Sequence, residues 1–76
     1  MNISGVLVKA FPENILTIEA SIASMAGVEV HGNNDDGRIV ITVEDNNANN
    51  ISDTLVTIQK IPGVLSAAMI YHQFEE

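Results

Sequence analysis

The chain has 76 residues and no cysteine, which excludes disulfide bonds, thiolate metal sites and cysteine nucleophiles. Three basic residues stand against ten acidic ones, and the formal net charge of −7 argues against a nucleic-acid partner or an anionic membrane surface. A chain this short predicts one domain over residues 1–76, with a small core built from its abundant Ile, Val and Leu side chains. The excess of β-branched residues favours strands.

The N-terminal residues carry no targeting pattern. No Lys or Arg precedes the first apolar run, Val6-Leu7-Val8, and that run is far too short for a signal-peptide core or a membrane span. We therefore expect a cytoplasmic protein that does not insert into a membrane.

The first half of the chain predicts a strand, a helix and a hairpin. The strand covers Ile3 to Ala10, and Pro12 suits the first turn of the helix that follows. That helix carries one apolar stripe and ends at Gly27. Val28 to His31 and Arg38 to Val43 are then paired strands around a turn rich in Gly, Asn and Asp. The stripe consists of Ile15, Ile18, Ile22 and Met25.

The second half repeats the helix and strand. Asn50 is the expected N-cap of a second helix, whose stripe is Ile51, Leu55, Ile58 and Ile61. Pro62-Gly63 ends this helix, Val64 to Tyr71 is the last strand, and His72 to Glu76 is a short tail. A weak repeat at an offset of 36 residues aligns Ile15 with Ile51, Ile22 with Ile58 and Gly27-Val28 with Gly63-Val64.

This element order predicts the α+β class. Two β-α-β units that cross right-handedly interleave into a ferredoxin-like βαββαβ sandwich, with a four-stranded antiparallel sheet of order 4-1-3-2 and both helices on one face. Alternation along each strand assigns one set of side chains to the helix-covered face: Val6, Val8, Val28, Val30, Ile39, Ile41, Val43, Leu65, Ala67 and Met69.

The opposite face of the sheet is expected to be open. Its expected side chains are apolar or small at the centre, with Glu29 and Glu44 at the rim: Gly5, Leu7, Lys9, Glu29, His31, Val40, Thr42, Ser66, Ala68 and Ile70. A register shift of one residue in the last strand would instead expose Leu65, Met69 and Tyr71. Isolated exposed aliphatic residues are common on small sheets, but this mixture also suits a docked apolar segment with a basic end.

Catalytic and metal-binding patterns are absent from the sequence. His31 and His72 are not spaced as metal ligands, Asp35-Asp36 does not continue as a calcium loop, and no phosphate-binding glycine loop is present. We expect no enzyme activity, no cofactor and no metal. The serines are expected to lack a neighbouring His: Ser4, Ser21, Ser24, Ser52 and Ser66. Two binding roles remain open, a regulatory domain that senses a small effector such as an amino acid, and a peptide-binding module.

The C-terminal stretch resembles the end of the NapD family. The similarity is carried by the Gly63-Val64-Leu65 strand opening, by Tyr71-His72-Gln73 and by the trailing Glu75-Glu76. The strands around Val28 and Ile41 also fit, whereas Phe11-Pro12 and Phe74 replace residues that are polar in the family.

This resemblance implies a chaperone for the periplasmic nitrate reductase. Members of the family bind the twin-arginine signal peptide of the catalytic subunit precursor and hold back its export until the molybdenum cofactor is loaded. From the face assignment, and not from positions matched to the family, we expect the apolar part of such a peptide to contact Leu7, Val40, Ala68 and Ile70. Its arginines are expected to lie near Glu44, Glu75 and Glu76. Main-chain pairing along the edge of the second or fourth strand is an alternative mode of docking.

Overall fold

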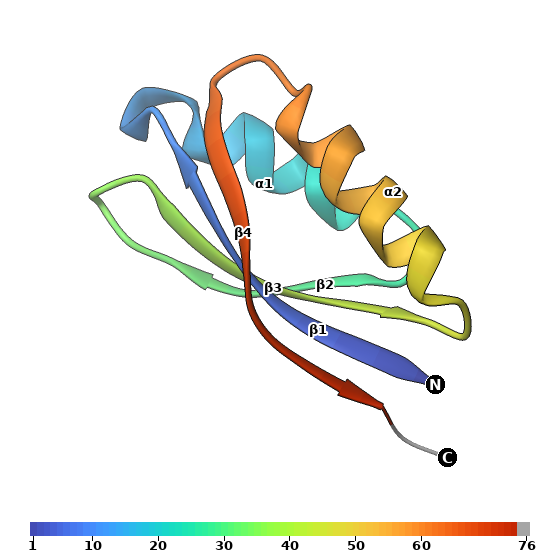
Figure 1. Cartoon of the computed structure of the whole chain (residues 1–76). Helices are drawn as coiled ribbons and strands as arrows, with labels where there is room; N and C mark the ends of the chain where they lie inside the picture. The colour runs from blue at the N-terminus through green and yellow to red at the C-terminus, as the bar shows by residue number, and fades with distance from the viewer. Residues whose placement is uncertain (75–76) are drawn as a thin grey trace.

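A computed structural model describes residues 1–74 and shows the predicted α+β sandwich (Figure 1). The four strands form one antiparallel sheet of order β2-β3-β1-β4, which is the predicted order named from its other edge. Both helices pack on one face of this sheet, as expected (Figure 1). The elements are β1 (Asn2–Ala10), a 3-10 turn (Pro12–Asn14), α1 (Ile15–Ala23), β2 (Val28–Asn33), β3 (Arg38–Asp45), α2 (Ala48–Gln59) and β4 (Val64–Phe74).

The core lies between the helices and the covered face of the sheet. Apart from Ala10, its buried side chains belong to the predicted helical stripes and covered-face positions, and almost all are aliphatic and β-branched: Val6, Val8, Ala10, Ile18, Ile22, Ile39, Ile41, Val43, Ile51 and Ile58. Other predicted core residues are only partly buried against this cluster: Met25, Val28, Val30, Leu55, Ile61 and Ala67. Ile51 and Ile58 of α2 are buried as Ile15 and Ile22 are in α1, so the two halves use equivalent positions.

Two glycines directly precede the strands that follow the helices. Gly27 and Gly63 have φ angles of +76° and +95°, which side chains other than glycine rarely adopt. The expectation that each glycine directly ends a helix is wrong, because α1 ends at Ala23 and α2 at Gln59. Each glycine instead ends the short turn after its helix, and the N–H of Glu44 donates to the Gly27 carbonyl at 2.8 Å.

The start of α2 differs from the prediction. Asn47 rather than Asn50 is the N-cap, and its side chain accepts a hydrogen bond from the backbone N–H of Asn49 at 2.8 Å. Asp45 at the end of β3 accepts from the Asn47 N–H at 2.9 Å and from the Asn50 amide at 3.1 Å. These hydrogen bonds hold the pKa of the Asp45 carboxyl below its ordinary value of 3.8, and the bond from the Asn47 N–H contributes most.

The last strand is longer than predicted. Residues 72–74, expected in the tail, continue β4 because they pair with Asn2, Ile3 and Ser4 of β1. β4 also contains two irregularities in its pairing with β1, at Leu65 and at Ile70, where one residue of β4 has no partner. These irregularities change which side chains of β4 reach each face of the sheet.

Candidate functional site: the open face of the sheet

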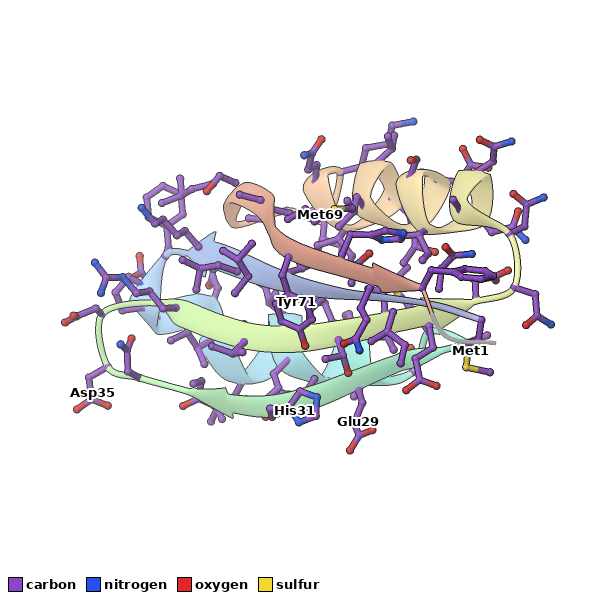
Figure 2. All side chains as sticks on the ribbon, turned by 60° about the horizontal axis from the view of Figure 1, so that its bottom comes forward. Met1, Glu29, His31, Asp35, Met69 and Tyr71 are labelled. Atoms are coloured by element: carbon purple, nitrogen blue, oxygen red, sulfur yellow. The ribbon has the colours of Figure 1, made fainter. Side chains whose placement is uncertain are left out.

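The face of the sheet away from the helices is open. Within residues 1–74, no other segment of the chain crosses it (Figures 1 and 2). Strand pairing and the bond of His31 to Thr42 assign its side chains: Glu29 and His31 of β2; Arg38, Val40, Thr42 and Glu44 of β3; Ile3, Gly5, Leu7 and Lys9 of β1; Ser66, Ala68, Tyr71 and Gln73 of β4. We call this set the open face.

An apolar row crosses the middle of the open face. Leu7 pairs with Val40 on one side and with Ala68 on the other, so the three side chains lie side by side across three strands. Val40 is 42% exposed. Three of the four residues that sequence analysis named for an apolar contact are thus neighbours on the open face.

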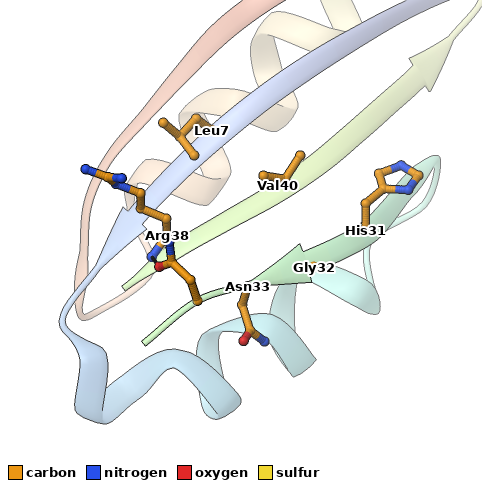
Figure 3. A pocket seen from close by; sticks show the side chains of 7 residues that line it. Leu7, His31, Gly32, Asn33, Arg38 and Val40 are labelled. Atoms are coloured by element: carbon orange, nitrogen blue, oxygen red, sulfur yellow. Dashed lines mark hydrogen bonds between the residues drawn. The ribbon is translucent and has the colours of Figure 1, made fainter. Parts of the chain in front are cut away.

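A shallow depression of about 410 Å³ extends from this row to the edge of the sheet. Leu7 and Val40 line one side of it, Arg38 lines one end, and residues 31–34 line the edge (Figure 3). A pairing irregularity in β2 between Val30 and Gly32 includes His31. The His31 ring Nε2 lies 2.8 Å from the Thr42 hydroxyl, which fixes the imidazole on the open face.

Tyr71 lies on the open face where β1 has a glycine (Figure 2). Gly5 and Tyr71 are cross-strand partners, and a Cβ atom placed on Gly5 would come within 2.0 Å of the Tyr71 ring carbon Cε1. Only glycine therefore lets the ring lie against β1. The ring is about half exposed and adds aromatic surface beside the apolar row.

The irregularity at Ile70 explains both registers considered for the last strand. Ser66 and Ala68 pair with Lys9 and Leu7, as the primary assignment predicts. Beyond the unpaired Ile70 the alternation shifts by one, and Tyr71 reaches the open face, as in the alternative register. Ile70 is 58% exposed, and its place outside the pairing separates it from the apolar row.

The covered-face assignment is wrong for one residue of β4. Leu65 is the unpaired residue at the other irregularity and is 59% exposed, so it does not enter the core. Ala67 and Met69 pair with Val8 and Val6 on the covered side, as predicted, although Met69 on this edge strand is partly exposed.

Charged side chains occupy opposite ends of the open face. Glu44 and Glu29 lie at one end, Glu44 opposite Ile3 near the start of β1 and Glu29 opposite Thr42 near the start of β2, and both are exposed. Lys9 and Arg38 lie at the other end, where they pair directly with each other. Glu75 and Glu76, which sequence analysis also named for contact with arginines, lie outside the described residues.

The opposite side of the sheet carries a polar network at one end. The Asn2 amide donates to the Asn46 carbonyl at 3.1 Å, and Asn2 Oδ1 lies 3.1 Å from His72 Nε2. The other ring nitrogen of His72, Nδ1, lies 2.7 Å from the Ser4 hydroxyl. The expectation that no serine has a neighbouring His is therefore wrong. Since Ser4 is completely buried, no substrate can reach its oxygen, and the network joins β1 to β4.

Consecutive residues of β4 thus act on opposite sides of the sheet. His72 forms hydrogen bonds with β1 on the covered side, whereas Tyr71 lies over Gly5 on the open side.

No group of three or more His, Cys, Asp or Glu side chains within residues 1–74 is arranged to hold a metal ion. None of the helices in this part of the chain is both long enough and apolar enough to cross a membrane.

Sequence analysis missed one feature of the open face and placed another there only in the alternative register of the last strand. One is the position of Arg38, although the alternation Arg38, Val40, Thr42, Glu44 along β3 was sufficient to place it there. The other is Tyr71, which depends on the unpaired Ile70, and an apolar run such as Ala67 to Ile70 contains no signal for a shift of one residue.

Comparison with known proteins identifies relatives over nearly the whole chain. The family model described as NapD protein matches residues 1–76. The proteins named Chaperone NapD from Escherichia coli strain K12 and from Shigella flexneri are each 27% identical over 75 residues, which covers 97% of this chain and 86% of the relative.

A solved structure has the same fold. The solution structure of the E. coli Tat proofreading chaperone protein NapD superimposes with a TM-score of 0.86 at 27% sequence identity. The match covers 97% of this chain and 79% of that protein. The similarity therefore extends through the sheet and both helices.

Proposed function

This chain belongs to the NapD family, and we propose that it is a cytoplasmic chaperone that binds the twin-arginine signal peptide of the periplasmic nitrate reductase catalytic subunit precursor. By binding the signal peptide, it holds back export of the precursor until the molybdenum cofactor is loaded. The relatives' name, Chaperone NapD, and the description of the solved relative as a Tat proofreading chaperone support this role over effector sensing. The role requires no catalytic residue.

The observation that carries the proposal is the open face. Within residues 1–74 this face of the sheet is uncovered, and it exposes an apolar row together with the ring of Tyr71, which Figure 2 shows. Burial of such surface against a partner is favourable at about 25 cal/mol per Å² before the costs of association. A twin-arginine peptide offers matching chemistry, since a cationic head is followed by a moderately apolar segment.

The side-chain contacts follow from the layout of this face. The apolar segment contacts Leu7, Val40 and Ala68, and Tyr71 extends the same surface. The proposed contact with Ile70 would reach past this row to the unpaired residue of the edge strand. The arginines lie near Glu44, and we extend the proposal to Glu29 of the neighbouring strand. The same role is proposed for Glu75 and Glu76.

Charge assists the encounter between chaperone and peptide. The formal charge of −7 attracts a dicationic head over a distance that salt controls, because the Debye length is about 8 Å at physiological ionic strength. The apolar contact, in contrast, does not weaken with added salt. Binding therefore combines one part that depends on salt with another that does not.

Titration calorimetry with synthetic peptides tests the proposal. The protein is titrated with a twin-arginine peptide and with a matched peptide in which both arginines are glutamine, each at low salt and at about 0.5 M sodium chloride. We expect the twin-arginine peptide to bind more tightly, by about tenfold at low salt, with a smaller difference at high salt. Absence of binding by the twin-arginine peptide in both conditions would contradict the proposal.

A further inference from the structure

The two ends of the open face carry opposite charge at well-separated positions. Glu44 and Arg38 are six residues apart on β3, and a strand rises about 3.3 Å per residue, so their backbones are about 20 Å apart. This separation exceeds the Debye length of about 8 Å, so a charged group bound at one end interacts mainly with the side chains of that end. The net charge attracts a cationic group to the protein, but the local charges determine at which end of the open face it binds.

The basic end has an arrangement that costs stability. Lys9 and Arg38 are direct cross-strand partners on the two central strands, and like charges in this position repel each other. Neither side chain has a hydrogen bond or an ion pair with another residue among residues 1–74. These are two of only three basic residues in the chain.

The acidic residues closest to Arg38 in sequence form no ion pair with it within residues 1–74. Asp35 and Asp36 lie in the turn that precedes Arg38, and Figure 2 shows Asp35 at the tip of that turn, directed away from the strands. The Asn34 side chain, not a carboxylate, accepts from the backbone N–H of Arg38 at 3.2 Å. Two cations therefore border the open face at this end.

The apolar surface lies between the two charged ends. The depression beside Leu7 and Val40 has Arg38 at one end, so an apolar segment that lies along it extends toward the basic end (Figure 3). A cationic group attached to that segment would meet repulsion from Lys9 and Arg38 in one direction and attraction from Glu29 and Glu44 in the other.

From this layout we propose that the open face imposes one direction on the bound peptide. The inference rests on the proposed function. The arginines lie over Glu29 and Glu44, the apolar segment that follows them crosses the row of Leu7, Val40 and Ala68, and the chain leaves the face over Lys9 and Arg38. The repulsive pair excludes the reversed direction whether the peptide binds as a helix or as a strand, because both forms carry the arginines at the same end.

Paramagnetic relaxation in the wild-type protein tests this direction. A twin-arginine peptide carries a nitroxide on a cysteine placed either before the arginines or after the apolar segment, and the chaperone has no cysteine of its own to react. With saturating peptide, the first label should abolish the amide signals of Ile3 and Glu44 and spare those of Lys9 and Arg38. The second label should do the reverse, and a diamagnetic label provides the control.

The outcomes separate the two proposals. If both labels affect both ends equally, or affect them in the opposite order, the peptide binds but its direction is not imposed as proposed, and only this inference fails. If the labelled peptides do not bind at all, the proposed function fails first.

A variant with exchanged charges tests the cause. Four exposed positions change together, Lys9→Glu and Arg38→Glu with Glu29→Lys and Glu44→Lys, so the formal net charge stays at −7. In this variant we expect the two relaxation patterns to exchange. An unchanged pattern would show that side-chain shape, not charge, sets the direction.

Discussion

The two faces of this sheet differ in what covers them, although the same strands build both. On β3, Ile41 is completely buried under the helices, whereas its neighbour Val40 is 42% exposed on the open face. Apart from the polar network at one end, the covered face is aliphatic, but the open face mixes an apolar row, an aromatic ring and charges at both ends. Burial on the covered face stabilises the folded chain. The exposed apolar surface of the open face is typical of an interaction site.

The largest loss of stability should come from truncating a buried side chain on the covered face. Ile41→Ala removes buried methyl groups and leaves a cavity, so we expect the free energy of unfolding to fall by about 2–5 kcal/mol. Val40→Ala on the same strand should cost less than about 1 kcal/mol. Urea denaturation of the two variants measures the difference, and equal losses would mean that the faces do not divide stability in this way.

The next effect concerns the contact of Tyr71 with Gly5. Gly5→Ala places a methyl group where the ring lies, so we expect a loss of about 1–3 kcal/mol in stability, and weaker binding of the twin-arginine peptide as the ring is displaced. In the double variant with Tyr71→Ala the clash is absent, and most of the stability should return. If Gly5→Ala costs as much without the ring as with it, backbone effects alone explain the loss.

A smaller effect should follow from the polar network on the covered side. Ser4→Ala removes the hydroxyl beside His72 Nδ1, and we expect a loss of about 1 kcal/mol in stability. Amide hydrogen exchange should show the loss first in residues 72–74, where β4 pairs with the start of β1. Unchanged exchange in this segment would contradict a structural role for His72.

The smallest effect concerns Asp45, which lies at the surface. Because its pKa is lowered in the folded chain, its ionised form contributes stability in full above its ordinary pKa of 3.8, and this contribution disappears as the pH falls through the lowered value. We expect wild type to be more stable than Asp45→Asn at neutral pH, and the difference to close in acid. Thermal melts of both proteins from neutral to acidic pH check this, and a gap that widens in acid would reverse the sign.

The fold could be predicted from the sequence because the patterns that define it are local and occur twice along the chain. Two apolar stripes of period 3.6, four alternating or apolar strands and two Gly-Val strand openings are sufficient to define the β-α-β repeat. The start of α2 was not accessible in the same way, because several asparagines in residues 46–50 suit a cap and only the bond from Asn47 to Asn49 distinguishes them.

The candidate site could be predicted only in part from the sequence. Alternation placed Leu7, Val40 and Ala68 on one face, and pairing then brought them into one row. The contact between Ser4 and His72 joins residues 68 positions apart, and the shift at Ile70 changes no local pattern, so neither follows from periodicity. Both depend on how the ends of β1 and β4 meet.

We propose that the open face, and not the charge of the whole protein, binds the peptide. Val40→Glu and Val56→Glu introduce the same charge at exposed valines, one on the open face and one on α2. Calorimetric titration of both variants with the twin-arginine peptide shows which of the two surfaces binds it. We expect Val40→Glu to weaken binding by at least about tenfold, with unfolding free energy within about 1 kcal/mol of wild type, and Val56→Glu to bind as wild type does. Equal affinities in the two variants would contradict the account.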